Sequence, residues 1–164
     1  LDPKGYVRAV KLLQWYKTKW GKAPDYIFAT NPVLHGPGST IWNKASFREI
    51  QTVAPLSNYY KMPVEHPVVE TDVNGFVNIL KNGEQYNGKT IFVCWDSYNI
   101  PLIVKQLGAT GNVPQWPSDD FDSTYILTFT EEGKLGHIEL LSNQYPVSSN
   151  VSWDSLINEF DMQY

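Results

Sequence analysis

The stretch Thr90-Ile91-Phe92-Val93-Cys94-Trp95 decides the fold, because a continuous apolar run of this length is typical of a strand buried on both faces. Strands of this kind belong to parallel sheets that helices cover on each side. A similar run, Asp25-Tyr26-Ile27-Phe28-Ala29-Thr30, lies upstream and is bounded by turn residues. The two runs predict buried strands in a protein of the α/β class.

Helical patterns occur on both sides of these runs. Asp2 is suited to cap a helix, Pro3 to its first position and Gly21 to its end, which predicts a helix from Pro3 to Trp20. Further helices are predicted over residues 47–60, 73–81 and 100–107, with a last one from Ser152 through Phe160. A brief extended segment is predicted around Val68-Val69.

The end of the chain carries a hairpin pattern. Two runs, at 125–129 and 136–140, flank the turn Glu131-Glu132-Gly133-Lys134. The order of all elements predicts an α/β three-layer αβα sandwich. A chain of 164 residues is the size of one domain, so residues 1–164 are expected to form a single unit.

Composition excludes several classes of partner. The formal net charge is −4 and there is no run of Lys or Arg, so nothing indicates a nucleic-acid-binding surface. No apolar run approaches the ~20 residues of a membrane span. Cys94 lies inside an apolar strand, which predicts an inert packed thiol. The compartment stays open, because Asn150-Val151-Ser152 is a glycosylation acceptor only in a secreted chain. Leu1 at the first position favours a processed product or a fragment of a longer precursor.

The candidate anion site lies at the start of the second predicted helix. Ser46 and Glu49 have the spacing of a capping box, which places Arg48 in the first turn. There the helix dipole, the open N–H groups and a guanidinium all favour a phosphate or carboxylate. The alternative, about equally favoured, is that Arg48 pairs with a surface carboxylate such as Glu49 or Glu65.

Other polar residues are expected to join Arg48. Ligands of open α/β sheets collect beyond the carboxyl ends of the strands, where Asn31 follows the first strand and Asp96-Ser97 follow the second. Together these side chains predict a pocket for a polar anion. They are a poor catalytic set, because Ser97 has no nearby histidine base and Asp96 has no second carboxylate.

These motifs together resemble the histidine phosphatase superfamily, in its phosphoglycerate-mutase-like branch. The resemblance spans most of the chain, from Leu1 to about Leu140, and its most specific element is Ser46-Phe47-Arg48-Glu49-Ile50-Gln51-Thr52. The other matching stretches are Leu1-Asp2-Pro3-Lys4-Gly5, Arg8-Ala9, Ala29-Thr30-Asn31-Pro32, Val93-Cys94-Trp95-Asp96-Ser97-Tyr98-Asn99-Ile100-Pro101, Leu107-Gly108, Trp116-Pro117 and Phe121-Asp122-Ser123.

The resemblance implies a phosphoryl-transfer site. In that superfamily a first strand ends in Arg-His-Gly, whose histidine is phosphorylated, and a second histidine follows the strand that matches Ile91 to Trp95. A further arginine, which maps onto Arg48, helps to hold the phosphoryl group, as expected for charge stabilisation.

This chain departs from the superfamily at the catalytic histidines. It has no Arg-His-Gly, and Asp96 or Ser97, depending on the alignment, stands where the second histidine belongs. An aspartate there would repel a bound anion. None of the three histidines of the chain, His35, His66 and His137, is expected to be the nucleophile. His35 is the least improbable of them, because its loop leaves the carboxyl end of a strand.

The first strand of the superfamily is also absent from this chain. An empty central slot in a sheet would expose two rows of backbone donors and acceptors. We therefore expect that an upstream peptide, preceding Leu1 in a precursor, fills the missing strand.

The sequence thus favours a catalytically inactive domain that keeps an anion pocket on Arg48 and serves binding or assembly, possessing no cofactor or metal site. The domain is expected to bind phosphate or another small anion, and the sequence is also compatible with binding to a protein partner. One alternative is an active phosphomonoesterase whose nucleophilic histidine lies on an upstream segment. Another is a structural or surface protein with a vestigial pocket.

Overall fold

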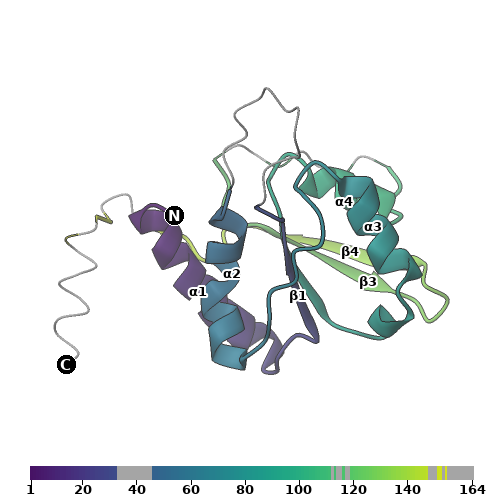
Figure 1. The fold of residues 1–164 in the computed structure, drawn as a ribbon, viewed down its shortest axis with the longest axis horizontal. Coiled ribbons are helices and arrows are strands. Elements are labelled where there is room, and N and C mark those ends of the chain that lie inside the picture. The colour runs from purple at the N-terminus through teal and green to yellow at the C-terminus, as the bar shows by residue number, and fades with distance from the viewer. Residues whose placement is uncertain are drawn as a thin grey trace.

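The computed structural model describes residues 1–32, 46–111, 113, 116, 119–147, 151, 152 and 154. In this part of the chain the fold is mixed α/β, with four α-helices and two two-stranded sheets (Figure 1). None of the described helices has both the length and the apolar character needed to cross a bilayer. The predicted helix ending at Phe160, the glycosylation acceptor residue Asn150 and His35 lie outside the described residues.

The first helix, α1, spans Pro3–Trp20 as predicted. The Asp2 carboxylate caps it by accepting a hydrogen bond of 2.7 Å from the N–H of Gly5. Gly21 ends it with φ at +66°, a left-handed conformation that glycine adopts without a steric penalty. Local sequence signals therefore fix both ends of α1.

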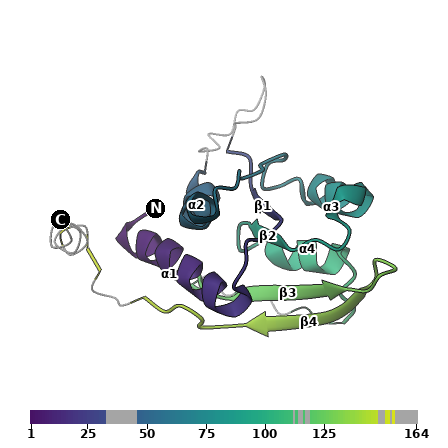
Figure 2. The same cartoon turned by 90° about the horizontal axis from the view of Figure 1, so that it is seen from below.

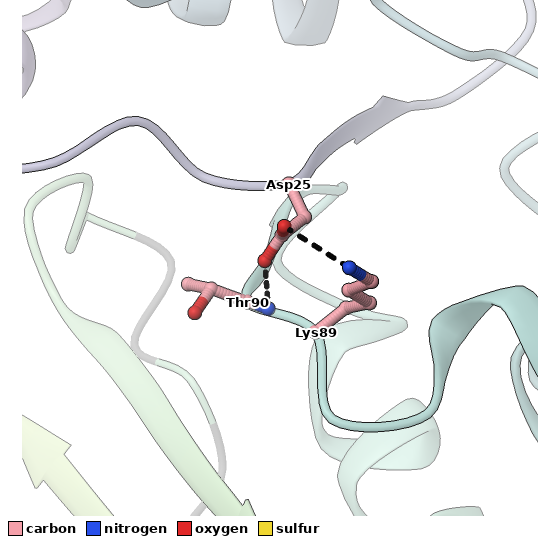
Figure 3. A network of polar contacts seen from close by, with 3 residues as sticks. All are labelled: Asp25, Lys89 and Thr90. Carbon is pink, nitrogen blue, oxygen red and sulfur yellow. Dashed lines mark hydrogen bonds and ion pairs between the residues drawn. The ribbon is translucent and has the colours of Figure 1, made fainter.

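The two predicted buried strands pair with each other. β1 (Tyr26–Ala29) and β2 (Ile91–Cys94) run parallel, with Tyr26 opposite Ile91. Their amino ends are joined by Asp25, whose carboxylate accepts from the N–H of Thr90 at 2.8 Å and lies 3.7 Å from the Lys89 ammonium (Figure 3). The Thr90 hydrogen bond, helped by the Lys89 charge, lowers the pKa of Asp25.

β1 also has a neighbour on its other edge. The N–H of Ala29 donates to the carbonyl of Glu65 at 2.9 Å, and the N–H of Glu65 donates to the carbonyl of Ile27 at 2.8 Å. The extended segment predicted around Val68-Val69 is therefore wrong in position, because the backbone that pairs with β1 is centred on Glu65. The Val68 carbonyl accepts only the N–H that follows β1, at Asn31.

Helices cover both faces of the β1–β2 pair (Figure 2). α1 and α2 (Arg48–Tyr60) lie on one face, and α3 (Val73–Asn82) and α4 (Ile100–Gln106) on the other. Alternate residues of β1 supply both cores, since successive side chains of a strand point to opposite faces. The first core contains the buried residues Tyr16, Ile27, Ala29, Val53 and Leu56, and the second Phe28, Val73, Phe76, Val77, Trp95 and Ile103.

The predicted hairpin forms a sheet of its own. β3 (Thr124–Phe129) and β4 (Leu135–Leu141) are antiparallel, with Thr124 opposite Leu141. No ladder among the described residues joins this hairpin to β1 and β2. The α/β class is thus confirmed, whereas the strands that the sequence assigns to one sandwich fall into two small sheets.

Candidate functional site

Arg48 is the first residue of α2 and its side chain is exposed. The guanidinium Nε donates to the Ser46 hydroxyl oxygen at 3.3 Å. The same hydroxyl donates to Oε2 of Glu49 at 2.9 Å, and the Glu49 side chain is buried, with 7% of its surface exposed. A short hydrogen-bonded series therefore runs from the exposed guanidinium to a buried carboxylate.

The predicted capping box does not form. The N-cap of α2 is Phe47, and no side chain caps it. Ser46 instead directs its hydroxyl proton to the Glu49 carboxylate, because that carboxylate is buried and needs a hydrogen-bond donor. The first N–H groups of α2 are consequently left without a side-chain acceptor from the described residues, beside the Arg48 guanidinium.

The alternative role of Arg48, pairing with a surface carboxylate, is not seen. No carboxylate in the described ranges forms an ion pair with Arg48, and the one ion pair found there joins Lys89 to Asp25. The Glu49 carboxylate accepts from the Ser46 hydroxyl, and the backbone of Glu65 pairs with β1. Among the described residues the guanidinium thus has the Ser46 hydroxyl as its hydrogen-bond partner and no carboxylate.

Asp96 has a local task at the end of β2. One of its carboxylate oxygens accepts from the N–H groups of Tyr98 and Asn99, at 3.1 and 3.2 Å, and the other accepts from the Asn99 side-chain amide at 2.9 Å. These bonds form an Asx turn that leads into α4. Asn99 is the N-cap residue of α4 but makes no side-chain cap bond.

The other pocket candidates lie at the same edge of the sheet. Asn31 follows β1 and Ser97 follows β2, both with half-buried side chains. Carboxyl ends of parallel strands share one edge, so the fold brings Asn31, Ser97 and the start of α2 to that edge. Within the described residues, no hydrogen bond or ion pair joins Arg48 to Asp96 or Ser97, so their membership of one pocket stays a prediction.

Glu49, expected from the sequence to be a capping residue or a surface partner of Arg48, is instead a buried polar residue at this edge. Burial, with a smaller contribution from the Glu49 charge, raises the pKa of Cys94 to about 12. The thiol at the end of β2 is thus close enough to sense that carboxylate, and the prediction of an inert cysteine is supported. The local sequence could not predict that Glu49 is buried, because the spacing Ser-x-x-Glu is the same for a capping glutamate and for a buried glutamate that accepts from the serine hydroxyl.

Two of the three histidines of the chain, His66 and His137, lie in the described residues. His66 follows Glu65 in the connector beside β1, and His137 lies on β4; both are exposed. Neither forms a hydrogen bond or ion pair with Arg48 in the part of the chain that is described. The same part contains no group of three His, Cys, Asp or Glu residues able to hold a metal ion.

No family model matches the chain, and a search of curated proteins finds no match. The resemblance to the histidine phosphatase superfamily therefore rests on the motifs quoted above.

Proposed function

We propose that this chain is a catalytically inactive, histidine-phosphatase-like domain that binds phosphate or another small anion through Arg48. The observation that carries the proposal is the pairing of an exposed guanidinium, without a carboxylate partner in the described residues, with an uncapped helix N-terminus. The guanidinium and the helix N-terminus both carry positive potential and donate hydrogen bonds, and one phosphate can accept from both.

The proposed fold is the three-layer αβα sandwich of the phosphoglycerate-mutase-like branch, with the first strand missing. Helices on both faces of the β1–β2 pair support this assignment. So does the position of Arg48 at the carboxyl edge, where a ligand of a parallel sheet is expected.

The proposal of inactivity depends on the residues after β2. Phosphoryl transfer through a phosphohistidine needs an imidazole as nucleophile and a cationic environment for the transferred group. Here the Asp96 carboxylate is held in a turn by three hydrogen bonds, and Ser97 has no histidine beside it in the sequence. Neither side chain supplies the missing ring.

Phosphate binding tests the proposal directly. With 100 mM phosphate and a dissociation constant of roughly 10 mM, binding stabilises the folded state by about 1.4 kcal/mol, which raises the melting temperature by a few degrees. Arg48→Gln should remove this shift. Arg8→Gln is the matched control, because it makes the same charge change on α1, where the guanidinium of Arg8 stacks on Phe121. Differential scanning fluorimetry at constant ionic strength, with chloride replacing phosphate, measures both.

Three results separate the candidate functions. A phosphate shift that Arg48→Gln abolishes and Arg8→Gln preserves, without turnover of p-nitrophenyl phosphate, supports the proposal. Turnover that Arg48→Ala abolishes would make the protein an active phosphomonoesterase. No shift at any phosphate concentration would leave the pocket vestigial, as in a structural or surface protein.

A further inference from the structure

The β3–β4 hairpin has a strand edge at β4 with no backbone partner among the described residues. β4 pairs with β3 on one side, and no described residue pairs with its other side. β4 runs along the margin of the described fold, with β3 between it and the helices (Figure 2). An edge of seven residues that contains neither proline nor lysine is a template for a further strand.

The register of the hairpin shows which backbone groups of β4 point outward. The N–H of Thr130 donates to the carbonyl of Lys134 at 2.8 Å, so Thr130 and every second residue before it direct their backbone groups to β4. One of these residues is Ile126, which lies opposite Glu139. Glu139 therefore directs its N–H and C=O to β3, and its neighbour Ile138 directs both groups away from the hairpin.

A second copy of β4 fits this edge in an antiparallel register centred on Ile138. In that register the two Ile138 residues exchange two backbone hydrogen bonds across a two-fold axis. His137 of each copy then lies opposite Glu139 of the other, at positions where facing side chains come closest. Both side chains are exposed and have no hydrogen bond or ion pair within the described part of the chain. The imidazole can donate to the facing carboxylate, and symmetry makes this pair twice.

The other face of the same register is apolar. Ile138 lies opposite its own copy there, and Leu127 of β3 lies beside it in the hairpin. Leu140, which is 40% exposed, comes opposite Gly136 of the second copy, and the missing side chain of that glycine leaves room for it. One face thus buries apolar side chains, and the other pairs a basic with an acidic side chain twice. A self-complementary surface has these properties.

We propose that β4 is a homodimer interface, at which the β3–β4 hairpins of two copies join into one four-stranded antiparallel sheet. A second copy is the occupant that fits, because its β4 supplies a glutamate to each histidine and a glycine to each exposed leucine by symmetry. The inference does not depend on anion binding, since Arg48 lies on α2 and takes no part in this edge.

Sedimentation equilibrium of the 164-residue chain tests the interface. The mass should rise from 18.7 kDa towards twice that value as the concentration increases from about 1 to about 500 μM. His137→Glu places like charges opposite each other twice and should raise the dimer dissociation constant at least about tenfold. Adding Glu139→Lys to this variant restores opposite charges, so the dissociation constant should return to within about threefold of the original value.

The matched control is His66→Glu, which makes the same charge change at an exposed histidine beside β1 and should leave the dissociation constant unchanged. Amide hydrogen exchange locates the contact in the unmodified chain. The Ile138 amide should exchange at least about tenfold more slowly at high than at low protein concentration, whereas the Glu139 amide, bonded within the hairpin, should be slow at both.

Four results would overturn the proposal. The chain could stay monomeric at about 500 μM, or His137→Glu could dimerise as tightly as the unmodified chain. The double variant could remain as weak as His137→Glu, which would separate the effect of that substitution from the charge pairing. Finally, the Ile138 amide could exchange equally at all concentrations: if fast in a dimer, the contact lies elsewhere, and if slow in a monomer, another part of the same chain covers this edge.

Discussion

β1 and β2 have the same length, run parallel and are both apolar, yet they are buried to different degrees. Ile27, Phe28 and Ala29 of β1 are 0% exposed, whereas every residue of β2 is half-buried. Helices cover both strands, but among the described residues β1 has a backbone partner on each edge and β2 on only one. The difference shows that an apolar sequence and helices on both faces do not by themselves bury a strand completely, and the strand that is less buried is the one with a single backbone partner in the described residues.

The largest expected effect compares a phenylalanine from each strand. Phe28→Ala should destabilise the protein by about 3–5 kcal/mol, because it empties a fully buried site in contact with Phe76 of α3. Phe92→Ala should cost about half as much, since its ring is only half-buried. Urea unfolding of both variants measures the difference. Equal losses would mean that β2 is as well buried in solution as β1, and the comparison between the strands would fail.

The next effect concerns Cys94, at the carboxyl end of β2. Burial raises the pKa of its thiol from the ordinary 9.0 to about 12, so the folded state keeps the proton that the unfolded state releases. This contribution to stability is complete below pH 9 and is lost as the pH rises from about 9 to about 12. The loss at pH 11 is about 3 kcal/mol.

Cys94→Ala should therefore make the free energy of unfolding fall less steeply with pH above pH 9. Urea unfolding at pH 8, 9, 10 and 11 gives the slope of the unfolding free energy against pH for the unmodified protein and for Cys94→Ala. A packing loss that does not depend on pH shifts the free energies of the variant but leaves the difference between the two slopes unchanged. Tyr16, whose pKa burial raises to about 12, contributes a decline of the same sign in both proteins. Identical slopes would show that the Cys94 thiol is exposed to solvent in the folded protein.

The smallest effect is expected at the hydroxyl that lies unpartnered beside β2. Tyr16→Phe removes a buried group with no hydrogen-bond partner in the described residues, so stability should be unchanged or higher by up to about 1 kcal/mol. Tyr145→Phe is the matched control. The Tyr145 hydroxyl bonds to the Thr124 side chain, so this variant should lose about 1 kcal/mol. If Tyr16→Phe lost as much stability as the control, the Tyr16 hydroxyl would have a hydrogen-bond partner in solution. It would then not be an unsatisfied polar group beside β2.

Part of the candidate site could be predicted from sequence. The position of Arg48 at the start of a helix follows from local spacing, and the structure places it there. The partner of Ser46 could not be predicted, because the same Ser-x-x-Glu spacing serves a cap or a side-chain hydrogen bond. Which of them forms depends on whether Glu49 is buried, and that is decided by the packing of α2 on the strands.

Asp96 is a similar case. Its place after β2 is evident in the sequence, and the rule for parallel sheets makes it a ligand candidate. Its three hydrogen bonds to the following turn depend on the course of the backbone between β2 and α4. An aspartate before a helix can serve either the turn or a ligand, and the backbone geometry selects the turn.

By itself, the sequence determined the elements whose signals are local: the ends of α1 at Asp2 and Gly21, the apolar strands β1 and β2, and the β3–β4 hairpin. Only the tertiary structure decided that Glu65 pairs with β1, that no described residue pairs with the second edge of β2 and that the described strands divide into two sheets. The reason is physical: caps and apolar runs act within a few residues of one another, whereas strand partners are chosen by backbone groups far apart in the chain.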